Sequence, residues 1–129
     1  MAARSLRRRG WRILARRWKS PHGEIDIACL THEGFLGEGF VGEGFAEEGF
    51  VAVEVKSTRR GASRWRPGAR LDRRGVERLR RAARHAGRHL GVSRWRVDLI
   101  EVHAPEPGRR LRMVHHQDLK GPVTAADDL

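Results

Sequence analysis

Hydrophobic and polar positions along the chain predict two helices and five strands. Apolar residues at three- and four-residue steps form one stripe over 71–90, which predicts a long helix ended by Gly91, and residues 2–9 predict a short helix ended by Gly10. Segments rich in Val and Ile between turn residues predict strands at 11–18, 24–30, 51–57, 96–102 and 111–115. The order α-β-β-β-α-β-β predicts an α/β fold with a mixed central sheet of about five strands flanked by helices.

Two of these strands carry charged residues among apolar ones. Glu24 and Asp26 alternate with isoleucines, and Glu54 and Lys56 alternate with valines. Because side chains alternate between the two faces of a strand, we expect Glu24 and Asp26 to share one face and the isoleucines to share the other. Antiparallel pairing of the two strands then brings three carboxylates and one ammonium together. Buried charges are costly unless they hold a metal or perform chemistry, so this cluster is the first candidate site.

The lysine in this cluster is unusual for this chain. Only three of its 27 basic residues are Lys, at positions 19, 56 and 120. A compact ammonium can orient or activate a water, which a bulky and permanently charged guanidinium does less well. The simpler alternative is a structural ion pair between Glu54 and Lys56, since a three-residue pattern of this kind is weak evidence alone.

An internal repeat of Glu-Gly-Phe pentapeptides separates the two charged strands. Removing residues 36–50 leaves an ordinary hairpin turn, so these residues read as a tandem expansion of that turn. An odd period cannot keep every Phe on one strand face, and we therefore expect a flexible loop outside the sheet ladder. Its deletion should leave the melting temperature nearly unchanged, because loop closure costs grow slowly with length.

The charge of the chain indicates a polyanionic partner. The net charge is +11, which favours nucleic acid first and an anionic membrane surface second. No apolar run approaches the roughly 20 residues that span a bilayer. Cys29 is the only cysteine, which excludes an intramolecular disulfide and is consistent with a cytoplasmic location; we expect it to be buried. Trp11 and Trp95 are expected in the core.

Arginines and one tryptophan outside the charged strands are candidates for contact with nucleic acid. A tryptophan between arginines can stack on an unpaired base or can pack beneath its loop, and a helix face rich in arginine can meet phosphates or only solvent. We expect Asp98 to pair with an arginine. The candidate nucleic-acid-binding residues are Arg59, Arg60, Arg64, Trp65, Arg66, Arg80 and Arg84.

The spacing of these motifs resembles the YraN family, which is similar to Holliday-junction resolvases and to PD-(D/E)xK nucleases. The resemblance rests on Gly23–Ile27, Val53–Lys56, Arg78-Leu79-x-x-Ala82-Ala83 and Arg96–Asp98, and it covers roughly residues 2–103. It implies a restriction-endonuclease-like core of three layers. One nuclease-like domain would then occupy residues 1–120, with the repeat inserted at 36–50 and a polar, disordered tail at 121–129.

The resemblance also implies a function and a site. Asp26, Glu54 and Lys56 take the family's two acid positions and its lysine, and Glu24 matches a further acid. Asp26, Glu54 and the backbone carbonyl of Val55 would hold Mg²⁺ or Mn²⁺ for hydrolysis of DNA, including branched DNA. A homodimer is implied by analogy with junction-cutting enzymes. Two other functions stay open: a non-catalytic nucleic-acid-binding module, and a basic adaptor that docks on an acidic protein through the repeat.

Overall fold

A computed structural model shows two helices and one sheet of five strands. It describes residues 1–35, 48–58, 71–103, 108 and 110–121. The order along the chain is the predicted one, and most boundaries lie within two residues of the prediction. The elements are α1 (Ala2–Arg8), β1 (Arg12–Ser20), β2 (Gly23–Thr31), β3 (Gly49–Thr58), α2 (Arg73–Leu90), β4 (Trp95–His103) and β5 (Arg112–His116).

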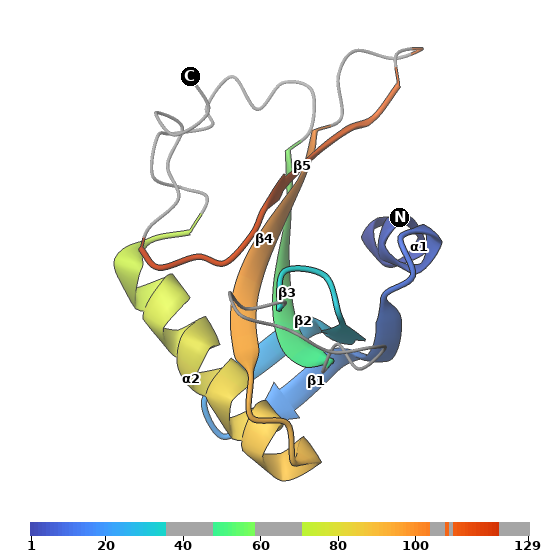
Figure 1. Ribbon diagram of the computed structural model, residues 1–129. Helices are drawn as coiled ribbons and strands as arrows, with labels where there is room; N and C mark the ends of the chain where they lie inside the picture. The colour runs from blue at the N-terminus through green and yellow to red at the C-terminus, as the bar shows by residue number, and fades with distance from the viewer. Residues whose placement is uncertain (36–47, 59–70, 104–107, 109, 122–129) are drawn as a thin grey trace.

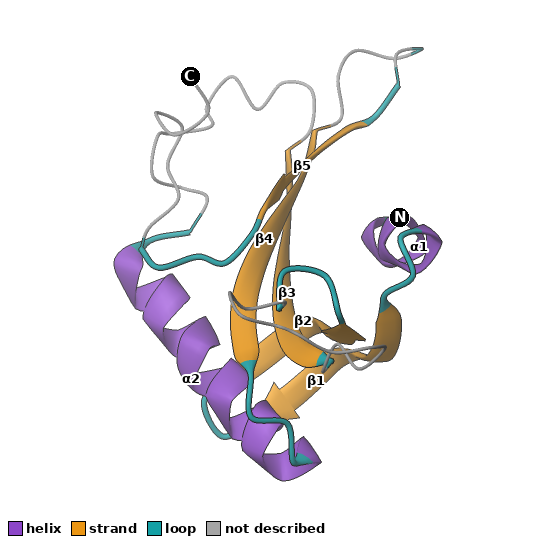
Figure 2. Ribbon diagram, in the orientation of Figure 1, coloured by secondary structure: helices purple, strands orange, loops and turns teal. Residues whose placement is uncertain are grey.

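The strands lie in the sheet in the same order as in the sequence. β1, β2 and β3 pair antiparallel, β3 and β4 pair parallel, and β4 and β5 pair antiparallel. A parallel pair needs a crossover connection, and α2 lies in that connection (Figure 1). Figure 2 shows α2 and α1 on opposite sides of the sheet. The chain is therefore an α/β fold with a mixed sheet and a restriction-endonuclease-like three-layer core, as the sequence predicted.

The long helix α2 owes its position to its ends and its apolar stripe. The Asp72 side chain caps the first turn by accepting a hydrogen bond from the Gly75 amide at 2.7 Å. Gly91 ends the helix in a left-handed conformation, with φ at 72°, which glycine adopts at little cost. The buried stripe packs on the sheet face that carries Phe50, Ala52 and Leu99, and this makes the larger of the two cores.

The second core lies between the other sheet face and α1. Leu6 of α1 and Trp11 pack there against Val51, Val53 and the sulfur of Cys29. Burial raises the pKa of the Cys29 thiol to about 12, and the nearby Asp98 carboxylate adds to the shift. The thiol is therefore an inert packing group, as the sequence predicted for it.

The last unit of the repeat belongs to the sheet. Gly49 and Phe50 open β3 and pair with Thr31 and Leu30, so the expectation of a loop as far as residue 50 was wrong. Phe50 is only 1% exposed, and Phe35 of the first unit is buried in the second core. A Cβ on Gly49 would overlap the Phe35 ring. Burial of Phe35 therefore requires a glycine at position 49, directly before Phe50. Residues 36–47 lie outside the described part.

A buried ion pair underlies the second core. Arg96 donates to both carboxylate oxygens of Asp98, at 3.0 and 3.3 Å. This confirms the prediction that Asp98 pairs with an arginine. The Arg96 guanidinium also lies over the rings of Trp11 and Phe35. His115 Nε2 lies 2.8 Å from Asp98 Oδ2, and its Nδ1 faces a guanidinium nitrogen of Arg9 at 2.7 Å. Because arginine only donates, Nδ1 accepts and Nε2–H donates to Asp98.

Candidate active site

The two charged strands lie beside each other as predicted. The antiparallel β2–β3 register extends to Ile27 opposite Val53, and Asp26 and Glu54 are the next residues on the two strands. At this point the Asp26 side chain takes part in the pairing, because its Oδ2 accepts a hydrogen bond from the Val55 amide at 2.8 Å. The carboxylate of Asp26 is thereby fixed beside the backbone of β3.

Glu54 and Lys56 form the ion pair that the spacing suggested. Lys56 Nζ lies 3.2 Å from Glu54 Oε1, with the Glu54 side chain 18% exposed and that of Lys56 44% exposed. Burial raises the pKa of Glu54, and the Asp26 carboxylate raises it further, while Lys56 and Arg78 oppose the rise. Two acids therefore influence each other here, and the two nearby cations compensate only part of the cost.

Arg78 of α2 completes this group, although no pattern in the sequence predicted it as a site residue. Its aliphatic stem packs on Gly23, where an added Cβ would lie 3.2 Å from Cδ. Arg78, Glu24 and Glu54 line one small hollow of about 10 Å³ between β2, β3 and α2. Such a volume admits about one water-sized species. The hollow is therefore an ionic pocket with no room for an organic ligand.

The faces of β2 differ from the prediction at this point. Ile25 packs in the core on the α2 side, whereas Ile27 packs in the core on the α1 side, so the two isoleucines do not share a face. On β1, Arg17 has φ at 51°, a left-handed conformation that is uncommon for a residue with a side chain. Glu24 is exposed and pairs with Arg17 at 3.1 Å. It reaches the hollow from its rim.

The same sheet face carries a second buried acid that the sequence analysis did not select. Glu101 of β4 pairs in register with Lys56 and is 2% exposed. Its carboxylate lies 2.5 Å from His116 Nε2 and 3.4 Å from His103 Nε2. Acid and imidazole groups therefore extend from the Glu54–Lys56 pair toward β5. Only the strand pairing brings them together, because Glu101 follows an apolar run that reads as an ordinary core strand.

The other predicted site residues divide into two groups. Arg59, Arg60, Arg64, Trp65 and Arg66 lie outside the described residues. Arg80 and Arg84 lie on α2, where Arg84 is exposed and Arg80 is half-buried. Within the described ranges, no three His, Cys, Asp or Glu side chains are placed to hold a metal ion together. Neither described helix combines the length and hydrophobicity needed to cross a membrane.

Comparisons with known proteins agree with the motif resemblance at the level of family. The model of the uncharacterised protein family UPF0102 matches residues 1–102. A UPF0102 protein of Roseiflexus castenholzii (strain DSM 13941 / HLO8) is 46% identical over 61 residues, which are 47% of this chain. The match spans 36% of that relative's length, so the chain covers about a third of it. This chain belongs to the uncharacterised protein family UPF0102, the YraN type that its motifs resemble.

Proposed function

We propose that the chain is a metal-dependent nuclease that hydrolyses nucleic-acid phosphodiesters at Asp26, Glu54 and Lys56. The observation that carries the proposal is the meeting of two carboxylates and one ammonium on β2 and β3, where the Asp26 side chain bonds to the β3 backbone. A sheet has no structural need for an acid beside Glu54 that raises the pKa of Glu54. The restriction-endonuclease-like fold supports the same reaction by analogy.

The residues present fit Mg²⁺ or Mn²⁺. Mg²⁺ takes oxygen ligands and is held by one or two carboxylates together with waters and substrate phosphates. Asp26 Oδ2 and Glu54 Oε1 already have protein partners, so the second oxygen of each carboxylate is the donor for a cation. A divalent ion would supply Lewis-acid charge stabilisation at the scissile phosphate. The raised pKa of Glu54 is consistent with this fit, because an added positive charge relieves the contact between the two acids.

Each residue of the proposed centre has a distinct task. Lys56, with 44% of its side chain exposed, presents its ammonium to the solvent side and orients the attacking water or the phosphate oxygen. Asp26 holds the Val55 amide, which fixes β3 relative to β2. Arg78 compensates the negative charge of Glu54 from the helix. The Val55 carbonyl stays a proposed additional ligand.

The composition supports nucleic acid as the substrate class. The net charge of +11 attracts a polyanion, and counterion release favours arginine–phosphate contacts. DNA, including branched DNA, is the proposed substrate. By analogy with junction-cutting enzymes, the proposed working form is a homodimer.

The deciding experiment is a cleavage assay with purified protein. Linear, single-stranded and four-way DNA are incubated with Mg²⁺, with Mn²⁺ and with chelator, and products are resolved on denaturing gels. We expect cleavage only with the metal. Lys56→Ala and Lys56→Arg should each abolish it while DNA affinity stays within about twofold, because affinity comes mainly from other cations. Lys19→Ala, which removes an equal charge from β1, is the matched control and should cut normally.

A second candidate function is a non-catalytic nucleic-acid-binding module. It is favoured by the absence, within the described ranges, of three metal-ligating side chains at one place. Wild-type protein that binds DNA and cuts no substrate with either metal would establish this module and reject the nuclease.

A further inference from the structure

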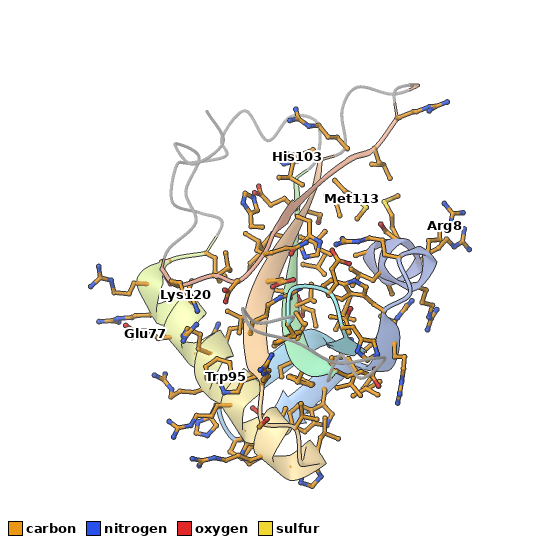
Figure 3. The ribbon with its side chains drawn as sticks, in the orientation of Figure 1. Arg8, Glu77, Trp95, His103, Met113 and Lys120 are labelled. Atoms are coloured by element: carbon orange, nitrogen blue, oxygen red, sulfur yellow. The ribbon has the colours of Figure 1, made fainter. Side chains whose placement is uncertain are left out.

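Trp95 lies between two open hollows at the start of β4. One hollow, of about 310 Å³, is lined by Trp95 and by residues of α2 that include Arg80, Arg81 and Arg84. The other, of about 350 Å³, is lined by Trp95 and by residues that include Arg94. Figure 3 shows Glu77, Trp95 and Lys120 on the side of the molecule that carries α2, away from Arg8 of α1. Trp95 is half-buried and packs against the larger core, so the prediction that it belongs to the core holds for part of its side chain.

We propose that these two hollows form a binding site for single-stranded nucleic acid, separate from the candidate active site. This proposal rests on the proposed function only in taking nucleic acid as the partner. It adds a second place on the molecule, where an unpaired strand binds whether or not cleavage occurs. We call this region the Trp95 groove, defined by Arg80, Arg81, Arg84, Arg94, Trp95 and Lys120.

Arg80 is held in a fixed position in the first hollow. Its guanidinium lies over the Trp95 ring, 4.9 Å from the centroid, and its Nη1 donates to the Leu119 carbonyl at 3.1 Å. A guanidinium fixed in this way presents its remaining donors and its outer face without further loss of side-chain freedom. Arg81 and Arg84 are exposed beside it, and among the described residues that line this hollow Glu77 is the only acid.

The second hollow continues the positive charge past Trp95. Arg94 is exposed and reaches across to the Phe35 carbonyl, and Ser93 adds a hydroxyl. Lys120 pairs with Asp118 at 3.2 Å, and both side chains are more than half exposed, so this pair is weakly held. A backbone that passes over Trp95 therefore meets cations on both sides of the ring.

The Trp95 groove lies away from the candidate active site on two counts. Arg78 and Arg80 project from opposite flanks of the buried stripe of α2, because they differ by about 200° around the helix. Along the sheet, Trp95 pairs with Phe50, four residues before Glu54, which corresponds to about 13 Å of strand. Asp26, Glu54 and Lys56 are not among the described residues that line the two hollows.

The shape of the groove favours an unpaired strand over a duplex. Proteins bind single strands with a cationic groove that follows the backbone and with flat groups on which exposed bases stack. The Arg80–Trp95 stack is such a flat group, since a base can stack on a guanidinium plane. A duplex hides its bases and gains only from the charge.

The test is binding without cleavage. Fluorescence anisotropy of labelled oligothymidylate, oligouridylate and a hairpin duplex is measured with chelator over a range of salt concentrations. Arg81→Ala with Arg84→Ala should weaken single-strand binding at least tenfold and reduce the salt slope by about 1.4, since each phosphate contact on a single strand contributes about 0.7. The matched control is Arg4→Ala with Arg7→Ala, an exposed pair of the same spacing on α1, which should change affinity less than threefold. The two oligomers distinguish a DNA from an RNA preference.

A second variant tests the stack. Trp95→Leu should weaken oligomer binding about tenfold and leave duplex binding within twofold, with folding checked by its melting temperature. If the Arg81/Arg84 and Arg4/Arg7 double variants lose equal affinity for single strands, the binding is a general effect of positive charge and the proposal is overturned. The proposal is also overturned if Trp95→Leu loses equal affinity for the duplex and for the single strand. Lys56→Ala should bind the oligomers normally. The binding test can therefore be interpreted even if the nuclease proposal fails.

Discussion

The strongest pH dependence at the residue scale is expected from Asp98. Burial raises its pKa, but hydrogen bonds from His115, Arg96 and the Asp118 amide outweigh burial, and the net pKa is lowered. A lowered pKa stabilises the fold above the unfolded value, near 3.8, and this contribution is lost as pH falls through the folded pKa. Asp98→Asn should therefore cost about 3–5 kcal/mol at pH 7, because it leaves Arg96 buried without its counter-charge.

Urea unfolding of wild type and Asp98→Asn at several pH values measures this effect. The difference in unfolding free energy should shrink below pH 3.8. If the difference in unfolding free energy between wild type and Asp98→Asn is constant from pH 7 to pH 3, the Asp98 carboxylate stabilises the fold through packing and not through its charge. Glu33, whose pKa is lowered by hydrogen bonds from Trp11 and Arg9 that outweigh burial, is the exposed comparison and should give a much smaller effect.

Arg78 gives a second prediction at the residue scale, which depends on the proposed nuclease activity. Arg78→Ala should slow metal-dependent cleavage about tenfold, roughly 1.4 kcal/mol of barrier, because Glu54 loses a compensating charge. Arg74→Ala, an exposed residue one turn earlier on α2, is the control and should retain activity. Single-turnover rates with saturating substrate measure the effect, and equal rates for Arg78→Ala and wild type would remove Arg78 from the centre.

The sequence was sufficient to predict some residues of the candidate site and not others. The meeting of Asp26, Glu54 and Lys56 followed from alternation and an antiparallel pairing, both of which are local rules. Arg78 and Glu101 join them through contacts between distant segments, which no local pattern reports. Ile25 and Ile27 pack in different cores, so regular alternation gave the wrong answer there.

At the scale of elements, the repeat between β2 and β3 has two buried ends. Deleting residues 36–50 removes the buried Phe50, so we now expect this deletion to cost about 3–5 kcal/mol, contrary to the sequence-based expectation. Deleting residues 38–47 keeps both Phe35 and Phe50 and joins segments already in contact, since the Phe35 ring lies against Gly49. This shorter deletion should change stability by less than 1 kcal/mol.

Thermal unfolding of the two deletion variants separates these expectations. A melting temperature for the 38–47 deletion as low as that of the 36–50 deletion would show that the intervening units support the fold. The helices and strands were otherwise predictable, because each shows a clear period and clear end signals. The strand start at Gly49 was missed because every unit of the repeat begins with the same Glu-Gly-Phe, and the pairing with β2 is what distinguishes its last unit.

At the scale of the whole molecule, two cores share one sheet. Leu6 of α1 is 1% exposed in one core, and Leu79 of α2 is 4% exposed in the other. Leu6→Ala and Leu79→Ala should each cost about 2–5 kcal/mol of unfolding free energy. Each variant should unfold in a single cooperative transition, because the sheet connects the two cores. The two costs should be additive, because the leucines belong to separate clusters. Fluorescence and far-ultraviolet circular dichroism should give coincident urea curves for each variant. Separate transitions would indicate layers that unfold independently.

The order of strands in the sheet also determines when the candidate active site is completed during synthesis. β1, β2 and β3 are joined by consecutive antiparallel pairings and can associate soon after they leave the ribosome, whereas the parallel β3–β4 pair must wait for α2. Asp26, Glu54 and Lys56 are therefore synthesised before Arg78, Glu101 and His116. A nascent chain would hold its acids together before their partners exist, and we expect the proposed nuclease activity to arise only once α2 has packed on the sheet.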